Sequence, residues 1–152
     1  MTRAWIALGS NVGDRRANLE RALAGLARTP STRVVRSSSW IETDPVGGPA
    51  GQGPYLNGVA ELETELGPRE LLERLLALER EAGRVRTVEG APRTLDLDLL
   101  LHGESRIDEP GLIVPHPRME QRIFVLAPLA ELAPDLVLPH CGRTVAERLR
   151  EL

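Results

Sequence analysis

The chain contains no lysine, a single cysteine and few aromatic rings. All 19 basic residues are arginine, which excludes a lysine of the Walker type or a Schiff-base lysine. The lone cysteine, Cys141, excludes an internal disulfide. Without a cysteine partner it offers no structural zinc site, and we interpret it as inert. Because aromatic residues make up only 3% of the chain, any pair of rings that could flank one ligand is informative.

Long apolar runs and a basic excess are also missing. No apolar run approaches the roughly 18–20 residues that a membrane-spanning helix needs, and the opening segment is too short for a signal peptide. We therefore expect a cytoplasmic protein with no membrane partner. The net charge of -3 argues against a nucleic-acid partner, whose phosphates attract a basic surface. The length fits one domain over 1–152 with one core, and we expect a monomer.

Hydrophobic patterning predicts the order strand, helix, strand, strand, helix, strand. This order matches a split βαβ plait, an α+β fold in which helices pack on an antiparallel sheet. The remaining residues, 102–152, are rich in proline, and we expect them to wrap the plait with short helices and loops. The predicted elements are a strand over 3–8, a helix between Asp14 and Thr29, strands over 33–41 and 55–65, a helix from Pro68 to about Gly83, and a strand over 95–101.

Two acidic residues lie two positions apart in the last predicted strand. Alternate side chains of a strand leave the same face, so Asp96 and Asp98 should stand roughly 6–7 Å apart. Two carboxylates at that spacing can hold a pair of magnesium ions, because magnesium prefers oxygen ligands that substrate phosphates complete. The alternative is an exposed strand face that carries two solvated acids.

Three arginines precede these acids within a polar segment, at positions 84, 86 and 93. Arg84, Arg86 and Arg93 could hold phosphate oxygens through bidentate hydrogen bonds and neutralise the charge of a transferred phosphoryl group. A solvated basic loop is the alternative interpretation. The position of these arginines directly before the acidic pair favours a phosphate site.

One histidine and two scarce rings complete the candidate residues. His116 lies between two prolines, which fix its direction, although a lone histidine is often structural. Tyr55 is the only tyrosine and Phe124 the only phenylalanine. The two rings could stack on both faces of a flat heterocycle, or each could fill the core.

Taken together, these motifs resemble those of the 6-hydroxymethyl-7,8-dihydropterin pyrophosphokinase family. The resemblance implies a ferredoxin-like fold, ATP as pyrophosphoryl donor and two magnesium ions. It also implies transfer to the hydroxymethyl group of the pterin, with release of AMP, in folate biosynthesis. The segments that carry it are ALGSN at 7–11, YLN at 55–57, GRVR at 83–86, PRTLDLD at 92–98 and VPH at 114–116, followed by Arg122, Phe124 and PL at 128–129.

The same resemblance implies roles for individual residues. Asp96 and Asp98 would hold the metal ions, and Arg84 and Arg93 would act with them in catalysis. The residues implied to bind ATP are Glu79, Arg84, Arg86, Arg93, His116 and Arg122. Those implied to bind the pterin are Thr43, Val46, Tyr55, Asn57 and Phe124.

Two other functions are compatible with the residues alone. Another magnesium-dependent phosphotransferase or phosphohydrolase could use the same acids. A module of the same fold could instead sense a nucleotide without turning it over. For the enzyme, we expect the Gly- and Pro-rich segment 44–54 and the polar segment 83–92 to close over the substrates and exclude water.

Overall fold

The computed structural model describes residues 1–44, 52–83 and 94–152. Its main sheet has the strand order β2-β4-β1-β5, and the short strand β3 pairs with the other end of β4 beyond β2. All of these pairs are antiparallel, as expected of a ferredoxin-like fold. The strands are β1 (Thr2–Ser10), β2 (Thr32–Ser37), β3 (Ile41–Thr43), β4 (Tyr55–Thr64) and β5 (Asp96–His102).

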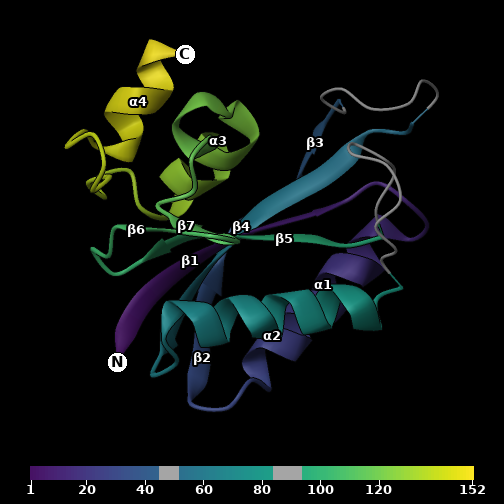
Figure 1. The fold of residues 1–152 in the computed structure, drawn as a ribbon. Helices are drawn as coiled ribbons and strands as arrows, with labels where there is room; N and C mark the ends of the chain where they lie inside the picture. The colour runs from purple at the N-terminus through teal and green to yellow at the C-terminus, as the bar shows by residue number, and fades with distance from the viewer. Residues whose placement is uncertain (45–51, 84–93) are drawn as a thin grey trace.

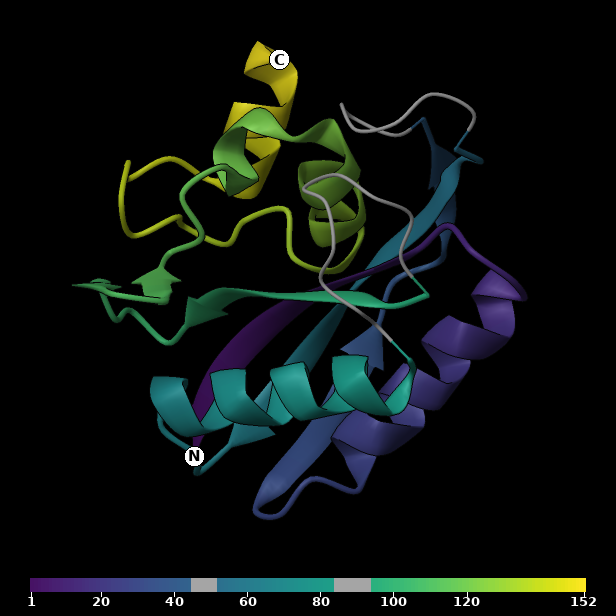
Figure 2. The ribbon, with the colours of Figure 1, turned by 45° about the vertical axis from the view of Figure 1, so that its right-hand side comes forward.

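Helices cover both faces of this sheet (Figures 1 and 2). Helices α1 (Arg15–Ala27) and α2 (Pro68–Glu81) lie on one face, as the split plait predicts. The 3₁₀ helix η1 (Met119–Gln121), α3 (Ile123–Leu132) and α4 (Val145–Glu151) belong to the opposite layer. The C-terminal segment therefore wraps the second face with short helices, as the sequence predicted.

The helices begin and pack where the sequence indicates. The Asp14 side chain accepts a hydrogen bond from the Ala17 amide at 3.1 Å and caps α1. Pro68 opens α2, where its missing N–H costs no helical hydrogen bond. In α2, Leu71, Leu75 and Leu78 are buried and form the apolar stripe that packs against the sheet.

Strand alternation divides the interior into two apolar clusters. Even-numbered residues of β1 and β4, such as Ile6 and Leu62, pack against α1 and α2. Odd-numbered residues, such as Trp5 and Val59, pack against α3 and α4. The sheet is therefore buried on both faces for most of its length. Strand residues beyond the end of the α3 and α4 layer are left uncovered and can form a site.

The strand predicted over 33–41 is wrong in its continuity, because it is broken into β2 and β3. At Ser38 the side-chain oxygen accepts from the Val59 amide at 2.9 Å, while the Ser38 amide donates to the Val59 carbonyl at 2.9 Å. A side chain thus takes the place of a backbone acceptor in the ladder. Trp40 then turns its ring over Gly58, and pairing resumes at Ile41.

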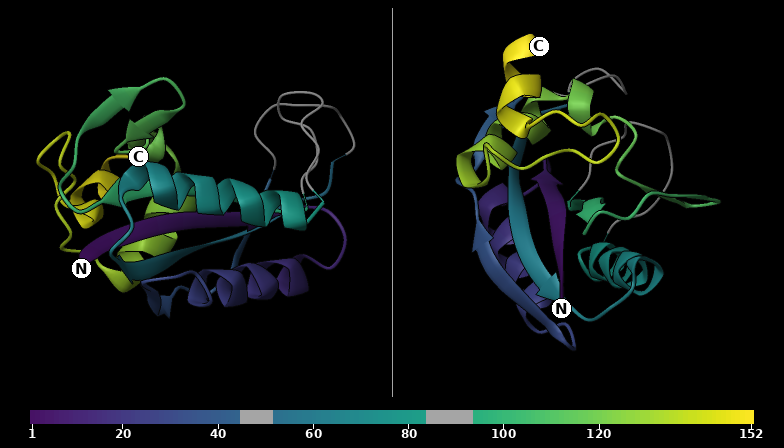
Figure 3. Two further views of the ribbon diagram at one scale, coloured as in Figure 1. Left: turned by 60° about the horizontal axis from the view of Figure 1, so that its bottom comes forward. Right: turned by 90° about the vertical axis from the view of Figure 1, so that its left-hand side faces the viewer.

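A hairpin of β6 (Ile107–Glu109) and β7 (Leu112–Val114) was not predicted from the sequence. It forms a separate two-stranded sheet that projects beside the layers (Figure 3). Gly111 makes its turn with a φ of 79°, after Pro110, and this Pro-Gly pair is the signal that could have indicated it. Among the described residues, no helix is both long enough and apolar enough to span a membrane.

The contact between Trp40 and Gly58 gives a test of the strand break. A Cβ atom at position 58 would overlap the Trp40 ring, so Gly58→Ala should lower the free energy of unfolding by about 1–3 kcal/mol. Urea denaturation measures this loss. In a Trp40→Leu background the same substitution should cost clearly less, since the ring is what it strikes. Equal costs in the two backgrounds would contradict this packing.

Candidate active site

One face of the sheet carries three of the residues singled out in the sequence, Asn57, Asp96 and Asp98. In the register of the sheet, Gly9 of β1 lies opposite Asn57 of β4 on one side and Asp96 of β5 on the other. Two residues earlier in β1, Ala7 lies opposite Val59 and Asp98. Because side chains alternate along each strand, Asn57, Asp96 and Asp98 all leave the face that α3 covers farther along.

A cavity of about 270 Å³ opens where this layer ends. The three strand ends form its floor, β3 forms one wall, and the segment that leads into α3 forms the opposite wall. Its described lining includes both polar and apolar groups, a combination typical of small-molecule sites. The residues that line it and concern the site are Ala7, Gly9, Thr43, Asp44, Tyr55, Asn57, Asp96, Asp98, His116, Arg118, Arg122 and Phe124.

Small residues on β1 leave open space above the strands that form the floor of this cavity. Gly9 is buried, and a Cβ atom there would lie 2.9 Å from the Asn57 side-chain oxygen and 3.3 Å from the Tyr55 ring. Ala7 projects only a methyl group beside Asp98. The small side chains of the ALGSN motif therefore leave the space that the cavity occupies.

The carboxylates of Asp96 and Asp98 are half-buried at the edge of β5 and line the cavity together. Between them, the Leu97 amide donates a hydrogen bond of 2.8 Å to a carboxylate oxygen of Glu79. Glu79 is 2% exposed and comes from α2, on the opposite face of the sheet. Its carboxylate thus fixes the backbone that bears the two acids, and Glu79 is not part of the cavity lining.

The ring of His116 is held beside these acids in a defined tautomer. The His116 amide donates to the Leu100 carbonyl at 2.9 Å, and Nδ1 accepts from the Arg118 amide at 3.2 Å. The neutral ring therefore carries its proton on Nε2, which lies 3.9 Å from an Asp98 oxygen. Burial first, then the charges of Arg122 and Arg118, lower the pKa of His116 to about 4 against the opposing charge of Asp96. At neutral pH this contact is thus not an ion pair.

The two aromatic rings both line the cavity, from different layers. Tyr55 begins β4, and Phe124 lies in the first turn of α3. The guanidinium of Arg122 lies 5.5 Å from the centroid of the Phe124 ring, which is cation–π distance. Below them, the Asn57 amide donates to the hydroxyl of Thr43, which orients both side chains.

The turn after β1 ties the start of α1 to the entry of β4. The Asn18 amide group donates to the Val12 carbonyl at 2.9 Å and closes the turn. The Asn11 amide group donates to the Gln52 side chain at 3.0 Å. Arg15 donates to the Pro54 carbonyl at 3.0 Å. The residues just before Tyr55 are therefore anchored on the β1–α1 connection.

The structure brings together eight of the predicted site residues in the cavity lining, and it places Glu79 outside that lining. Those in the cavity lining are Thr43, Tyr55, Asn57, Asp96, Asp98, His116, Arg122 and Phe124. Arg84, Arg86, Arg93 and Val46 lie outside the described residues, as do most of the two segments expected to close over the substrates. Sequence reasoning missed Arg118, although its place two residues after His116 was a usable signal, and it missed Asp44 at the end of β3.

Solved structures with the same arrangement define the class of fold. A crystal structure described as HPPK-DHPS in complex with substrates matches 99% of this chain with a TM-score of 0.74 at 11% identity. Wild-type HPPK-DHPS of Plasmodium falciparum matches 99% with a TM-score of 0.72 at 13% identity. This chain spans 43% of each of those longer chains. At such low identity the likeness establishes the fold, which is ferredoxin-like.

Sequence comparison goes further than fold. A relative from Pseudomonas aeruginosa, named 2-amino-4-hydroxy-6-hydroxymethyldihydropteridine pyrophosphokinase, is 51% identical over 97% of this chain and 90% of its own length. A Bacillus subtilis relative of the same name is 51% identical over 85% of this chain and 77% of its own length. The model of the 7,8-dihydro-6-hydroxymethylpterin-pyrophosphokinase family matches residues 5–134. The chain belongs to this family.

The lowered pKa of His116 gives a measurable expectation for the protein without ATP or divalent metal. Nitrogen-15 NMR should show the neutral Nε2–H tautomer until the pH approaches about 4. Between pH 6.5, the ordinary pKa of histidine, and pH of about 4, His116 is protonated in the unfolded chain and neutral in the folded chain. Stability should therefore fall as pH falls through that window.

A His116→Gln variant serves as the control, because it lacks this part of the pH dependence. The unfolding free energy of the wild type minus that of the variant should fall on acidification from pH 6.5 toward about 4. Half-protonation of His116 near its ordinary pKa would show that burial does not act as described.

Proposed function

We propose that the cavity described above is the site of pyrophosphoryl transfer, and that Asp96 and Asp98 hold two magnesium ions there. Membership of the family makes the chain a pyrophosphokinase that uses ATP and 6-hydroxymethyl-7,8-dihydropterin in folate biosynthesis. The observation that carries the site is the meeting of two half-buried carboxylates with two aromatic rings in one cavity.

The donor set fits magnesium. Asp96 and Asp98 offer hard oxygen ligands from one strand face, and they leave coordination positions for water and phosphate, as magnesium requires. The neutral His116 ring adds no competing positive charge beside them. Bound magnesium supplies positive charge that neutralises the triphosphate and the charge that develops during transfer.

Positively charged and donor groups face the carboxylates from the segment before α3. Arg118 and Arg122 line this wall, and the Nε2–H of His116 points into the same region. These groups can bind phosphate oxygens of ATP, with the arginines supplying charge and His116 a neutral donor. Arg84, Arg86 and Arg93 are assigned to the phosphates, and Glu79 to ATP, by resemblance to the family. For Glu79, however, the contact with the Leu97 amide favours a role in positioning β5, the strand that bears Asp96 and Asp98.

The pterin is assigned to the side of the cavity between β4 and α3. Tyr55 and Phe124 provide two ring faces, and Arg122 lies by the Phe124 ring. The side chains of Asn57 and Thr43, oriented by their mutual hydrogen bond, can pair with polar atoms on the edge of the pterin. By the same resemblance, Val46 contributes from the segment that follows β3.

The reaction is a displacement at the β-phosphorus of ATP. The hydroxymethyl oxygen of the pterin forms a bond to that phosphorus, and the bond to the oxygen that bridges the α- and β-phosphates breaks. AMP leaves, and the hydroxyl proton passes to water. The contribution of the residues is to hold both substrates in line and to supply positive charge, and we assign none of the described lining residues as a general base.

We also infer a monomer that acts in the cytoplasm. The absence of a membrane-spanning helix among the described residues is compatible with this location, as is the family's biosynthetic reaction. Size-exclusion chromatography with light scattering checks the oligomeric state directly.

Removal of one metal ligand is the central functional test. Asp98→Asn should lower pterin-dependent AMP formation from ATP and magnesium by at least about a hundredfold, because even changes around a metal's ligands cost 10- to 100-fold. Asp108→Asn is the matched control, since Asp108 is an exposed carboxylate in β6 away from the cavity. Equal activity of Asp98→Asn and wild type would remove the metal assignment, and ADP formation without pterin would indicate a phosphohydrolase instead.

The proposed stacking of the pterin gives a separate test. Phe124→Leu should weaken pterin binding roughly 5- to 150-fold, the range expected when one aromatic–base contact worth about 1–3 kcal/mol is lost. Isothermal titration with the pterin and a non-hydrolysable ATP analogue measures it. Phe124→Tyr keeps the ring and should bind within a few fold of wild type. Equal losses in both variants would indicate a packing role for Phe124.

A further inference from the structure

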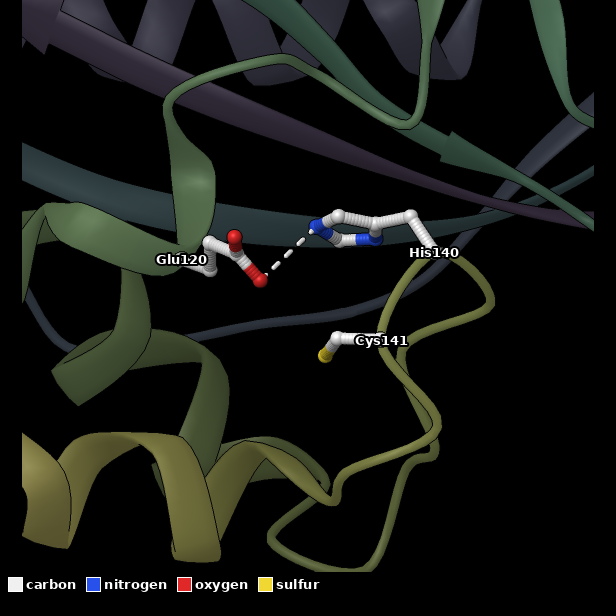
Figure 4. A group of neighbouring side chains, drawn as sticks. All are labelled: Glu120, His140 and Cys141. Carbon is white, nitrogen blue, oxygen red and sulfur yellow. Dashed lines mark ion pairs between the residues drawn. The ribbon is translucent and has the colours of Figure 1, made fainter.

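A second group of metal-ligating side chains lies apart from the cavity residues described above. Glu120 of η1, His140 and Cys141 each bring one ligand atom to within 4.8 Å of the other two. Figure 4 shows the three side chains turned toward a shared space from two segments, with Glu120 on one side and the loop before α4 on the other. The family resemblance assigns no role to any of these three residues.

We propose that Glu120, His140 and Cys141 bind a zinc ion. Zinc takes nitrogen, sulfur and oxygen ligands at about 2.0–2.3 Å, which places the ligand atoms roughly 3.5 Å apart. In the structure the three ligand atoms lie within 4.8 Å of one another, so a bound ion would draw them about 1 Å closer together. The thiolate favours zinc over magnesium, which prefers oxygen ligands alone.

The histidine is the most telling member of this group. Both ring nitrogens of His140 are buried, and neither has a hydrogen-bond partner among the described residues. Its Nε2 lies 3.2 Å from a Glu120 carboxylate oxygen without the alignment of a hydrogen bond. Buried ring nitrogens without hydrogen-bond partners are costly, and coordination of a metal ion by one of them offsets part of that cost.

The backbone around the ligands is already ordered. In the loop, the Leu138 amide donates to the Arg143 carbonyl at 2.8 Å, and the Gly142 amide donates back to the Leu138 carbonyl at 2.8 Å. On the other side, Arg148 of α4 donates to the Glu120 carbonyl at 2.7 Å. The positive charge of Arg148 is shared with Glu151 at 3.5 Å. The backbone that carries the three ligands is therefore held in place before any ion binds.

A zinc ion here would link the loop before α4 to a segment that lines the active-site cavity. Glu120 lies two residues from Arg118 on one side and two from Arg122 on the other. The sequence alone indicates an inert Cys141, because the chain has no second cysteine to partner it. The fold supplies His140 and Glu120 instead, and Glu120 comes from 21 residues before Cys141 in the sequence.

Cobalt(II) is the probe, because its bonds to thiolate sulfur absorb in the near ultraviolet and Cys141 is the only cysteine. The wild-type chain should show this band, saturating at one ion per chain. Cys141→Ser should abolish it, and His140→Ala and Glu120→Gln should each weaken cobalt binding by at least about tenfold, the lower end of losses seen around metal sites. Zinc should displace the cobalt and raise the Tm of the wild type only.

Two control variants test whether the cobalt band depends on carboxylates outside the proposed zinc site. Asp98→Asn should leave the thiolate band unchanged, which keeps this test independent of the proposed magnesium site. Glu104→Gln, an exposed carboxylate elsewhere, should also leave it unchanged. The proposal is overturned if the wild type shows no thiolate band, or if the band keeps its affinity in both His140→Ala and Glu120→Gln.

Discussion

The site depends on the antiparallel pairing of β1 with β4 on one side and β5 on the other. This register sets Gly9 between Asn57 and Asp96, so a residue assigned to the pterin and one assigned to the metal flank one glycine. A shift of either neighbour by one residue would turn its side chains to the opposite face, into the core beneath α1 and α2. The two apolar clusters, one on each face, oppose such a shift because most side chains of β1, β4 and β5 are already buried on their own face.

Several contacts hold β5, the strand at this edge of the sheet, in its position. From below, the buried Glu79 accepts a hydrogen bond from the amide of Leu97, between the two acidic positions. From above, the amide of His116 is bound to the Leu100 carbonyl, and this bond holds the segment before α3 against β5. The acidic pair is thus fixed by both layers before any substrate arrives, which is the preorganisation that transfer of a charged group demands.

Much of this was predictable from periodicity, and the remainder depended on tertiary contacts. Alternation in DLDLLL placed Asp96 and Asp98 on one face, and the strand-helix order indicated the plait. The break at Ser38 was not visible, because it arises from a side chain that binds the amide of Val59 across the sheet. The positioning contact of Glu79 and the meeting of Glu120 with His140 are equally non-local. Family resemblance supplied the substrate, which no local pattern of residues could name.

The most direct test of the account is a crystal structure of the chain with magnesium, a non-hydrolysable ATP analogue and 6-hydroxymethyl-7,8-dihydropterin. The account predicts metal ions about 2.0–2.1 Å from carboxylate oxygens of Asp96 and Asp98. It also predicts the pterin ring between Tyr55 and Phe124, with its hydroxymethyl group directed at the β-phosphorus. Metal ions bound away from both acids, or a pterin outside this pair of rings, would contradict it.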